Sequence, residues 1–397
     1  MHKLVLTLTL FTALFAQTGC AASDSETQPL PVPDAGAGPA KGYTPLTPAD
    51  NEDKIDKEIV RELQHDHYNK IGLNDAFSSE FLQAYLDDLD GTHSVFLAQD
   101  VERLRDKYGD SLDDQLKNGN LTAAFDVFNT YQKRRIQIDQ WALARISKGL
   151  DTLDLSDDDR FTVDREKAPW PDGAKAREKL WTQQLENQVI DLRLSDVEPE
   201  EIEKRLTQRY TNELKQLRQA EAVDAFSVYM DAYTHSYDPH TDYFSPRRAE
   251  DFSIDMNLSL QGIGAELRSK NGYAELVRLI PGGPAAKSGK LKPTDRIIAV
   301  GQGESGEFTD VIGMRLDETV QLIRGKKGST VRLQVQPQDT GPTTTVVLQR
   351  DKIELKDQAA SSKVINIKQN GHAHDIGVIS LPSFYNGTAD DVEKQLV

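Results

Sequence analysis

The chain has 397 residues, of which 38% are hydrophobic and 28% charged, enough apolar material for two or three domains with cores. Its formal net charge of −17 argues against a nucleic-acid partner, because such proteins usually present a basic face. The single cysteine, Cys20, excludes an intramolecular disulfide and any metal site built on several thiolates.

Residues 1–22 have the order of an export signal. Lys3 gives a basic start, residues 4–15 form an apolar run, and small residues follow. Two processing routes fit this pattern: lipidation of Cys20, as in a lipoprotein, or cleavage just after Ala21 or its neighbour to give a soluble protein. Either route places the chain outside the cytoplasm, with membrane contact only through a lipid on Cys20. The alternative is an ordinary buried N-terminal helix.

Residues 23–51 are rich in Pro, Ala, Gly, Ser and Thr, which predicts a disordered linker. Residues 52–250 are predicted to form a helical domain, because apolar side chains recur there at helical spacing. One such stripe contains Leu121, Ala124, Phe125 and Phe128.

The pattern changes near Phe252, and residues 251–352 are predicted to form a small β domain. Short runs of alternating apolar and polar residues are separated by Gly and Pro, as is typical of strands. Two short helices interrupt the strands, one over residues 284–288 before Gly289 and one over residues 317–324 before Gly325.

Residues 353–397 are predicted to begin a further domain. A strand covers residues 376–381, and a helix starts at Ala389. The chain stops inside this helix, so we expect it to be truncated.

The most informative motif is QGIG at residues 261–264, which leads into a predicted strand. Two glycines around one bulky residue allow backbone N–H groups to turn toward a common point and hold a carboxylate. A peptide tail would then lie along the strand. Taken alone, the same glycines fit a bulge or a tight turn.

The order of the motifs around QGIG resembles the circularly permuted PDZ domains of bacterial proteases. The resemblance is carried by QGIG, by PGGPAA at residues 281–286, by LKPTDRIIAVG at residues 291–301 and by VQLIRG at residues 320–325. DPHTDYFSP at residues 238–246 and GVISLPSFY at residues 377–385 are similar to segments of the tail-specific (C-terminal processing) protease family.

The resemblance implies a multidomain α+β protein: a helical N-terminal domain, a PDZ domain with two helices, and the start of an α/β protease core. It also implies a periplasmic serine endopeptidase in which a lysine acts as general base for a serine nucleophile. No position of this chain matches that serine or lysine, so we expect no catalytic residue here and no activity of the chain alone.

The resemblance further implies the residues that bind substrate, an apolar C-terminal tail of a periplasmic protein. These are Gln261, Gly262, Ile263 and Gly264 in the loop, and Leu316, Val320 and Ile323 on the facing helix. Leu355, in the segment 351–357, is the predicted hinge through which tail binding reports to the protease core. A lipoprotein adaptor that delivers substrate is a further partner implied by the family.

Two other interpretations were weighed. A complete, non-catalytic PDZ adaptor on a helical scaffold is the alternative function. A metal site at His235, Asp238, His240 and Asp242 is disfavoured, because Pro239 breaks the helix that would align the two histidines. We therefore expect neither a metal nor another cofactor.

Overall fold

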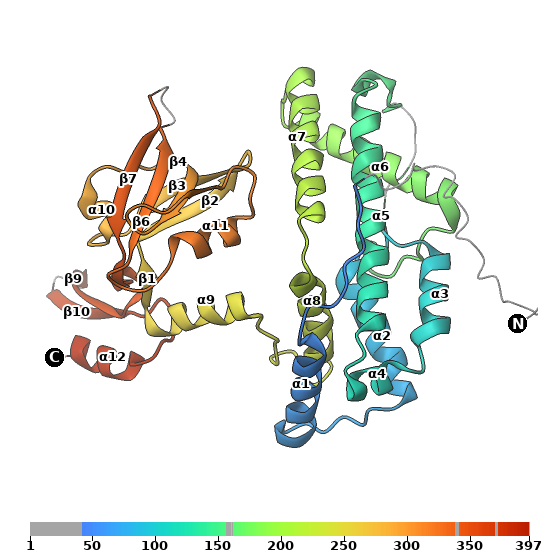
Figure 1. The fold of residues 1–397 in the computed structure, drawn as a ribbon, viewed down its shortest axis with the longest axis horizontal. Helices are drawn as coiled ribbons and strands as arrows, with labels where there is room; N and C mark the ends of the chain where they lie inside the picture. Colours follow the sequence, from blue (N-terminus) through green and yellow to red (C-terminus); the bar gives the residue numbers. More distant parts are fainter. Residues whose placement is uncertain (1–41, 156–159, 161, 338–340, 370–371, 397) are drawn as a thin grey trace, which may run out of the picture.

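The computed structural model describes residues 42–155, 160, 162–337, 341–369 and 372–396. The architecture is α+β, as predicted, with helices in the first part of the chain and mainly strands after residue 258. Figure 1 shows a helical bundle and a β-rich part side by side, connected by helix α9. The predicted export signal, Cys20 and most of the predicted linker lie outside the described residues.

The helical domain extends from α1 to α8. Asn74 begins one of its helices, since its side chain accepts a hydrogen bond of 3.0 Å from the Phe77 N–H. Its helices are α1 (Glu52–Asp66), α2 (Asp75–Leu89), α3 (Ala98–Tyr108), α4 (Leu112–Asn118), α5 (Thr122–Ile146), α6 (Gly173–Leu194), α7 (Pro199–Arg218) and α8 (Ala222–His235), with a short 3-10 helix at Leu150–Thr152.

An aromatic core holds the lower half of this bundle together. Phe81 of α2 lies 5.1 Å from Tyr229 and 5.8 Å from Tyr233 of α8, measured between ring centroids, and all three side chains are buried. Edge-to-face and tilted contacts of this kind stabilise beyond the area that they bury. A second apolar cluster joins α5, α6 and α7, so α7 packs along α5.

Helix α9 (Pro246–Asn257) connects the two parts. Ser245 begins it, since its hydroxyl accepts a hydrogen bond from the Arg248 N–H and Pro246 occupies the first helical position. All its residues are exposed or half-buried. The predicted boundary at residue 251 therefore falls inside a helix, and the first strand starts only at Ser259.

The β domain extends from β1 to β8. Its main sheet has the order β2-β3-β4-β6-β7, with β5 paired to β4 and all pairs antiparallel. Strands β1 and β8 form a separate pair. The strands are β1 (Ser259–Gly262), β2 (Ala265–Lys270), β3 (Tyr273–Leu279), β4 (Arg296–Gln302), β5 (Phe308–Asp310), β6 (Thr330–Gln336), β7 (Thr344–Gln349) and β8 (Asp351–Glu354).

Two helices complete the β domain. Helix α10 (Pro284–Ser288) confirms the predicted helix, with Pro284 at its first position and Gly289 ending it at φ 63°. Helix α11 (Leu316–Ile323) lies one residue earlier than predicted, because Arg315 rather than Leu316 takes the extended conformation before the first turn. Both helices contribute apolar side chains to one core with the sheet.

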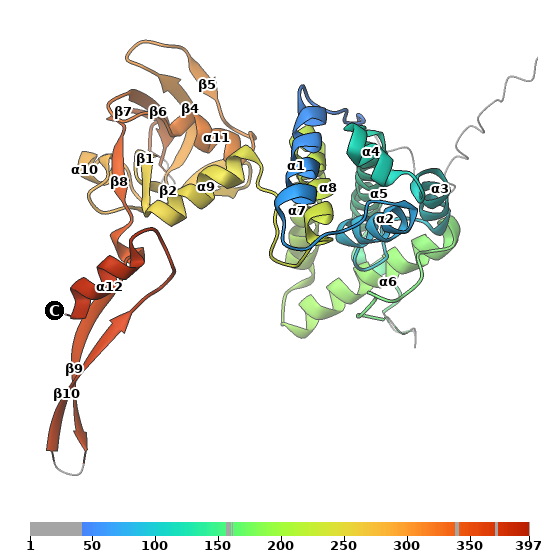
Figure 2. The same ribbon diagram turned by 90° about the horizontal axis from the view of Figure 1, so that it is seen from below.

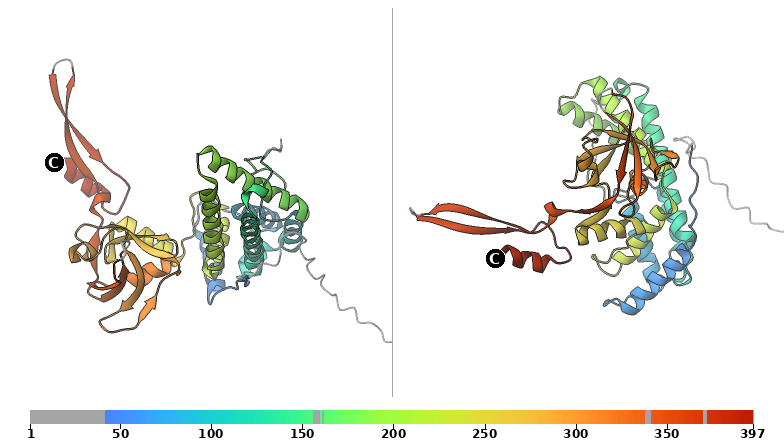
Figure 3. Two further views of the ribbon diagram at one scale, coloured as in Figure 1. Left: turned by 90° about the horizontal axis from the view of Figure 1, so that it is seen from above. Right: turned by 60° about the vertical axis from the view of Figure 1, so that its left-hand side comes forward.

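The last described segment projects away from the β domain. Strands β9 (Ser361–Gln369) and β10 (His372–Ser380) form an antiparallel hairpin, followed by α12 (Thr388–Leu396). The strand predicted over residues 376–381 is thus longer at its start. Figures 2 and 3 show the hairpin extending away from the sheet.

Candidate functional site

Strand β2 offers an open backbone edge. Among the described residues it pairs with β3 and with no other strand. The Ile280 N–H donates to the Gly264 oxygen (2.9 Å), and this bond flanks the pair Ala265–Leu279. In an antiparallel ladder the members of such a flanked pair do not bond each other. The N–H and C=O of Ala265 therefore point away from β3, to the open edge.

Helix α11 lies beside this edge and forms the second wall of a slot. We use "slot" for the space between the open edge of β2 and α11, two elements in direct contact. Leu316 and Val320 are half-buried, so each is partly covered and partly accessible. Ile323, predicted to bind substrate with them, is only 4% exposed and packs inside the core of the β domain.

The loop at residues 261–264 closes one end of the slot. The Ala285 N–H donates to the Ile263 oxygen (2.8 Å). Since the C=O and N–H of a trans peptide point in opposite directions, the N–H of Gly264 points away from α10. The Ile263 side chain is 3% exposed and belongs to the core, so Ile263 presents only its backbone to the slot.

The two glycines of the loop have different roles. Gly264 has φ +73°, and a Cβ atom there would lie 3.2 Å from the Gly283 Cα and 3.3 Å from the Ile353 Cγ1. Both the left-handed conformation and the close approach require glycine. A Cβ at Gly262 would meet nothing closer than 3.5 Å, and Gly262 ends β1 opposite Asp351. Gln261 turns its side chain to accept a hydrogen bond from the Lys327 N–H (2.9 Å).

Helix α9 runs along the outer flank of α11. Glu250 accepts a hydrogen bond from the Gln321 side chain (2.8 Å), and Asp251 one from the Arg324 guanidinium (2.8 Å). These partners lie on the face of α11 next to the one that carries Leu316 and Val320. The contacts therefore hold α11 from a face other than the one that carries Leu316 and Val320.

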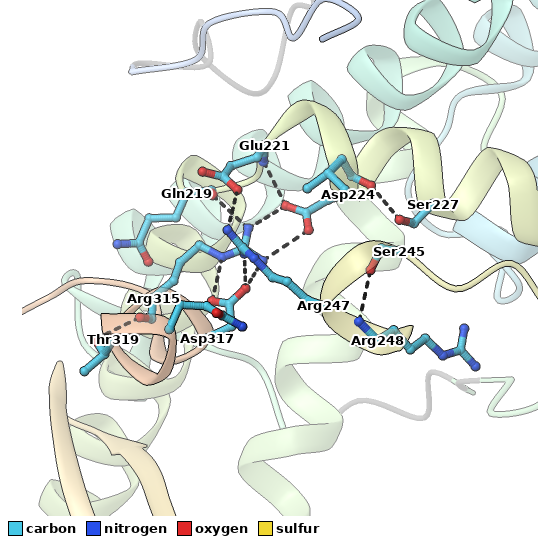
Figure 4. A network of polar contacts seen from close by, with 12 residues as sticks. Gln219, Glu221, Asp224, Ser227, Ser245, Arg247, Arg248, Arg315, Asp317 and Thr319 are labelled. Atoms are coloured by element: carbon cyan, nitrogen blue, oxygen red, sulfur yellow. Dashed lines mark hydrogen bonds and ion pairs between the residues drawn. The ribbon is translucent and has the colours of Figure 1, made fainter. Parts of the chain in front are cut away.

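Interdomain ion pairs anchor the start of α11 to the helical domain (Figure 4). The Arg315 guanidinium donates to Asp224 of α8 (3.1 Å), to the Gln219 oxygen (3.1 Å) and to Asp317 (3.1 Å). Arg247 bridges Asp317 and Glu221. Burial alone would raise the pKa of Asp317, but the hydrogen bonds and charges of Arg315 and Arg247 lower it below its ordinary value.

Three cavities lie near the loop at residues 261–264 or at the boundary between the domains. One of about 340 Å³ lies at the loop, between Ile254 of α9, Leu260 and Gly325. One of about 630 Å³ lies behind the loop and is lined by Leu355. The third, of about 770 Å³, opens between the two domains at Leu316.

The predicted hinge residue Leu355 lies between β8 and a 3-10 helix at Lys356–Gln358, and its N–H donates to the Leu258 oxygen (2.8 Å). The segment is thus tied to the end of α9 and to β1. Sequence reasoning missed this pairing, because β1 and β8 are four residues each and lie about 90 residues apart.

The disfavoured metal site around His235 and Asp242 lies near the end of α8. His235 and Asp242 contact each other at 3.0 Å, but the described residues contain no group of three or more His, Cys, Asp or Glu side chains arranged to hold a metal ion. Within the same residues, no helix combines the length and apolar character that crossing a bilayer requires.

Comparison with known proteins identifies both domains. Residues 59–247 match the family model "Tail specific protease N-terminal domain", and residues 251–336 match the model "PDZ domain". Over residues 59–247 and 251–336 the chain resembles the tail-specific and carboxy-terminal processing proteases.

The relatives are considerably longer than the matched segment. The tail-specific protease of Haemophilus influenzae is 42% identical over 341 residues, which are 86% of this chain and 48% of the relative. The carboxy-terminal processing protease CtpB of Bacillus subtilis is 35% identical over 159 residues, 40% of this chain and 30% of the relative. The chain thus spans about half the length of the first relative, and its match covers less than a third of the second.

A solved structure also matches the β domain in sequence. The PDZ domain of a carboxy-terminal protease from Vibrio cholerae, solved in complex with a peptide, is 49% identical and covers 25% of this chain and all of that one, with a TM-score of 0.24.

Proposed function

We propose that the chain binds the apolar C-terminal tails of proteins in the slot, and that it is the substrate-recognising part of a tail-specific serine endopeptidase. The observation that carries this proposal is the open edge of β2 beside α11, closed at one end by the loop around Gly264. A tail can add a strand to β2 through main-chain hydrogen bonds, while backbone N–H groups of the loop hold its carboxylate.

The proposal gives each predicted residue a definite part. Gly262, Ile263 and Gly264 contribute backbone, and Gln261 holds the loop against Lys327. Leu316 and Val320 contact the apolar side chains of the tail, because they are the half-buried members of the α11 face. Ile323 supports this face from the core. Leu355 is proposed as the hinge, since the strand pair β1–β8 that precedes it connects the loop to the segment that follows.

The central experiment measures peptide binding by fluorescence anisotropy. A peptide ending in Val-Ala with a free carboxylate is expected to bind the 397-residue chain, and the amidated peptide is not. Val320→Asp should weaken binding about tenfold or more, because it puts a charge on the apolar wall.

Val347→Asp is the matched control, since Val347 is 52% exposed on β7 at the opposite edge of the sheet. Thermal unfolding of both variants would show that each still folds. Equal affinity for free and amidated peptides, or equal losses in the two variants, would refute tail binding in the slot.

The protease part of the proposal concerns the whole protein. A Ser/Lys endopeptidase with this recognition domain should degrade a reporter with an apolar free tail and spare the amidated reporter. With the complete gene product, Val320→Asp should slow the first reaction. Degradation that ignores the tail would contradict the proposed coupling.

The proposed location is the periplasm, either in soluble form or through a lipid on Cys20. Fractionation of cells that carry the wild type or Cys20→Ala distinguishes the two forms. Release of both the wild type and Cys20→Ala by osmotic shock indicates the soluble form. Release of Cys20→Ala alone indicates the lipid anchor. A cytoplasmic fraction for both would contradict the proposal.

A further inference from the structure

The largest of the three cavities lies between the domains and meets the slot. It has a volume of about 770 Å³. Ser269 and Gly272, at and beyond the end of β2, and Leu316, at the start of α11, form its β-domain side. Residues of α5 and α7 form its helical-domain side, among them Tyr131 and Lys215. We call it the interdomain cavity.

The direction of a bound tail follows from the position of the loop. If the tail's carboxylate is held at Gly264, before the first residue of β2, the tail must run antiparallel to β2. Its upstream residues then pass toward Ser269 and the start of α11. At about 3.4 Å per residue, the six residues of β2 face five or six residues of the tail. The residues before those reach the interdomain cavity.

Contacts between the domains hold the two sides of the cavity in place. The Gln219 side chain donates to the Gly313 oxygen (2.6 Å), and the Gly313 N–H donates to the Gly272 oxygen (2.6 Å). Arg315 adds its bonds to Asp224 and to the Gln219 oxygen. Because both sides are fixed before a ligand arrives, little ordering entropy remains to oppose binding.

The charges around the cavity leave one cation without an acidic partner. Arg135 pairs with Glu213 at 3.0 Å, and Arg315 pairs with Asp224 and Asp317. Among the described residues, the Lys215 ammonium has neither an ion pair nor a hydrogen bond to a carboxylate. It lies against two turns of the β domain, because a Cβ atom added at Gly272 or Gly313 would come 3.2 Å or 3.1 Å from its Nζ.

We propose that the helical domain completes the tail-binding site. The interdomain cavity receives the residues that lie six to eight positions before the tail's carboxyl end, and Lys215 binds an acidic side chain among them. Tyr131, Leu217 and Leu316 provide apolar contact around that charge. This inference rests on the proposed function, because it needs a tail held in the slot.

The experiment compares three peptides that share the same four C-terminal residues and a free carboxylate. One is the tetrapeptide alone, and two are decapeptides with Glu or Lys at the seventh position from the end. On the 397-residue chain, the Glu decapeptide should bind about tenfold more tightly than the tetrapeptide and about fivefold more tightly than the Lys decapeptide. Lys215→Glu should reverse the preference between the decapeptides and leave the tetrapeptide unchanged.

Lys204→Glu is the matched control, because Lys204 is an exposed lysine on the same helix, three turns away. It should change none of the three affinities. If all peptides bind equally well and Lys215→Glu has no effect, the cavity plays no part in recognition, and tail binding in the slot still stands. If no peptide binds, the proposed function fails and this inference fails with it.

Discussion

The helical domain and the β domain each enclose a carboxyl group that has no exposed surface, Asp56 and Glu275. Neither carboxylate oxygen of Asp56 has a hydrogen-bond partner within the described residues, and burial raises its pKa to about 7. Glu275 accepts a hydrogen bond from Arg268 (2.9 Å), with Lys270 at 3.2 Å, and these partners lower its pKa. Burial alone therefore does not decide the charge of an enclosed carboxyl group; its partners do.

The two domains also differ in the surroundings that they give to these carboxyl groups. The helical domain is closed around its aromatic core and encloses a carboxyl group whose pKa is raised to about 7. The β domain leaves one edge of its sheet open and covers its carboxylate with long cations that reach in from the surface, Arg268 being 54% exposed. The predictions below test this contrast.

The largest effect is expected for Asp56→Asn. Because the pKa of Asp56 is raised from 3.8 to about 7, the folded protein loses stability as the pH rises between these values, since the unfolded chain ionises first. The variant should raise the free energy of unfolding by up to about 4 kcal/mol at pH 8 and change little at pH 4. Urea unfolding at both pH values measures it, with exposed Glu62→Gln of the same helix as control. An equal effect at both pH values would show that Asp56 is not held neutral.

The next effect changes no charge. Gly264→Ala should destabilise the β domain by about 2–3 kcal/mol, since the left-handed conformation and the contact with Gly283 both oppose a side chain. Tail binding should be lost with it. Gly262→Ala, where a Cβ meets only ordinary contacts, is the control and should retain most of the stability. Similar melting curves for both variants would mean that the loop adapts to a side chain.

A smaller effect is expected at the boundary between the domains. Arg315→Ala removes hydrogen bonds to Asp224 and Asp317 and should cost about 1 kcal/mol. Hydrogen exchange at the starts of α8 and α11 should become faster. Arg278→Ala breaks an exposed ion pair inside the β domain and should leave exchange at those helices unchanged. Unchanged exchange in Arg315→Ala would show that other contacts fix the domains.

The smallest effect is expected for Glu275→Gln. Because the pKa of Glu275 is lowered, its contribution is present above about pH 4 and is lost as the pH falls through the folded value. The variant should therefore melt at a slightly lower temperature at pH 7, and this difference should shrink as the pH falls below about 4. Glu266→Gln, on the same sheet and 48% exposed, is the control. A difference in melting temperature that does not shrink with falling pH would mean that packing, and not charge, is lost.

Much of the fold follows from local signals in the sequence. Pro284 and Gly289 define both ends of α10, and the glycine-rich loop identifies the start of β2. Helix α9 carries a comparable signal in Ser245 and Pro246, but strand-like alternation starts soon after it and hides the helix from sequence reasoning.

The remainder depends on contacts between distant residues. Asp224 and Arg315 are 91 positions apart, and no local pattern pairs them. The same holds for Lys215, one of two lysines on the amphipathic helix α7, which becomes notable only beside Gly272 and Gly313. Ile323 is buried whereas Leu316 and Val320 are half-buried, although all three occupy one helical face, and the sequence does not predict this difference.

The ion pair between Arg315 and Asp224 also bears on inheritance. The two residues belong to different domains, and the ion pair between them persists only while one position encodes an acidic residue and the other a basic residue. A chimera could join the helical domain of one relative to the PDZ domain of another. It would keep this bond only if the first parent has an acidic residue at position 224 and the second a basic residue at position 315. Recombination at α9 should therefore keep or lose this contact according to a pair of residues of which each parent supplies only one.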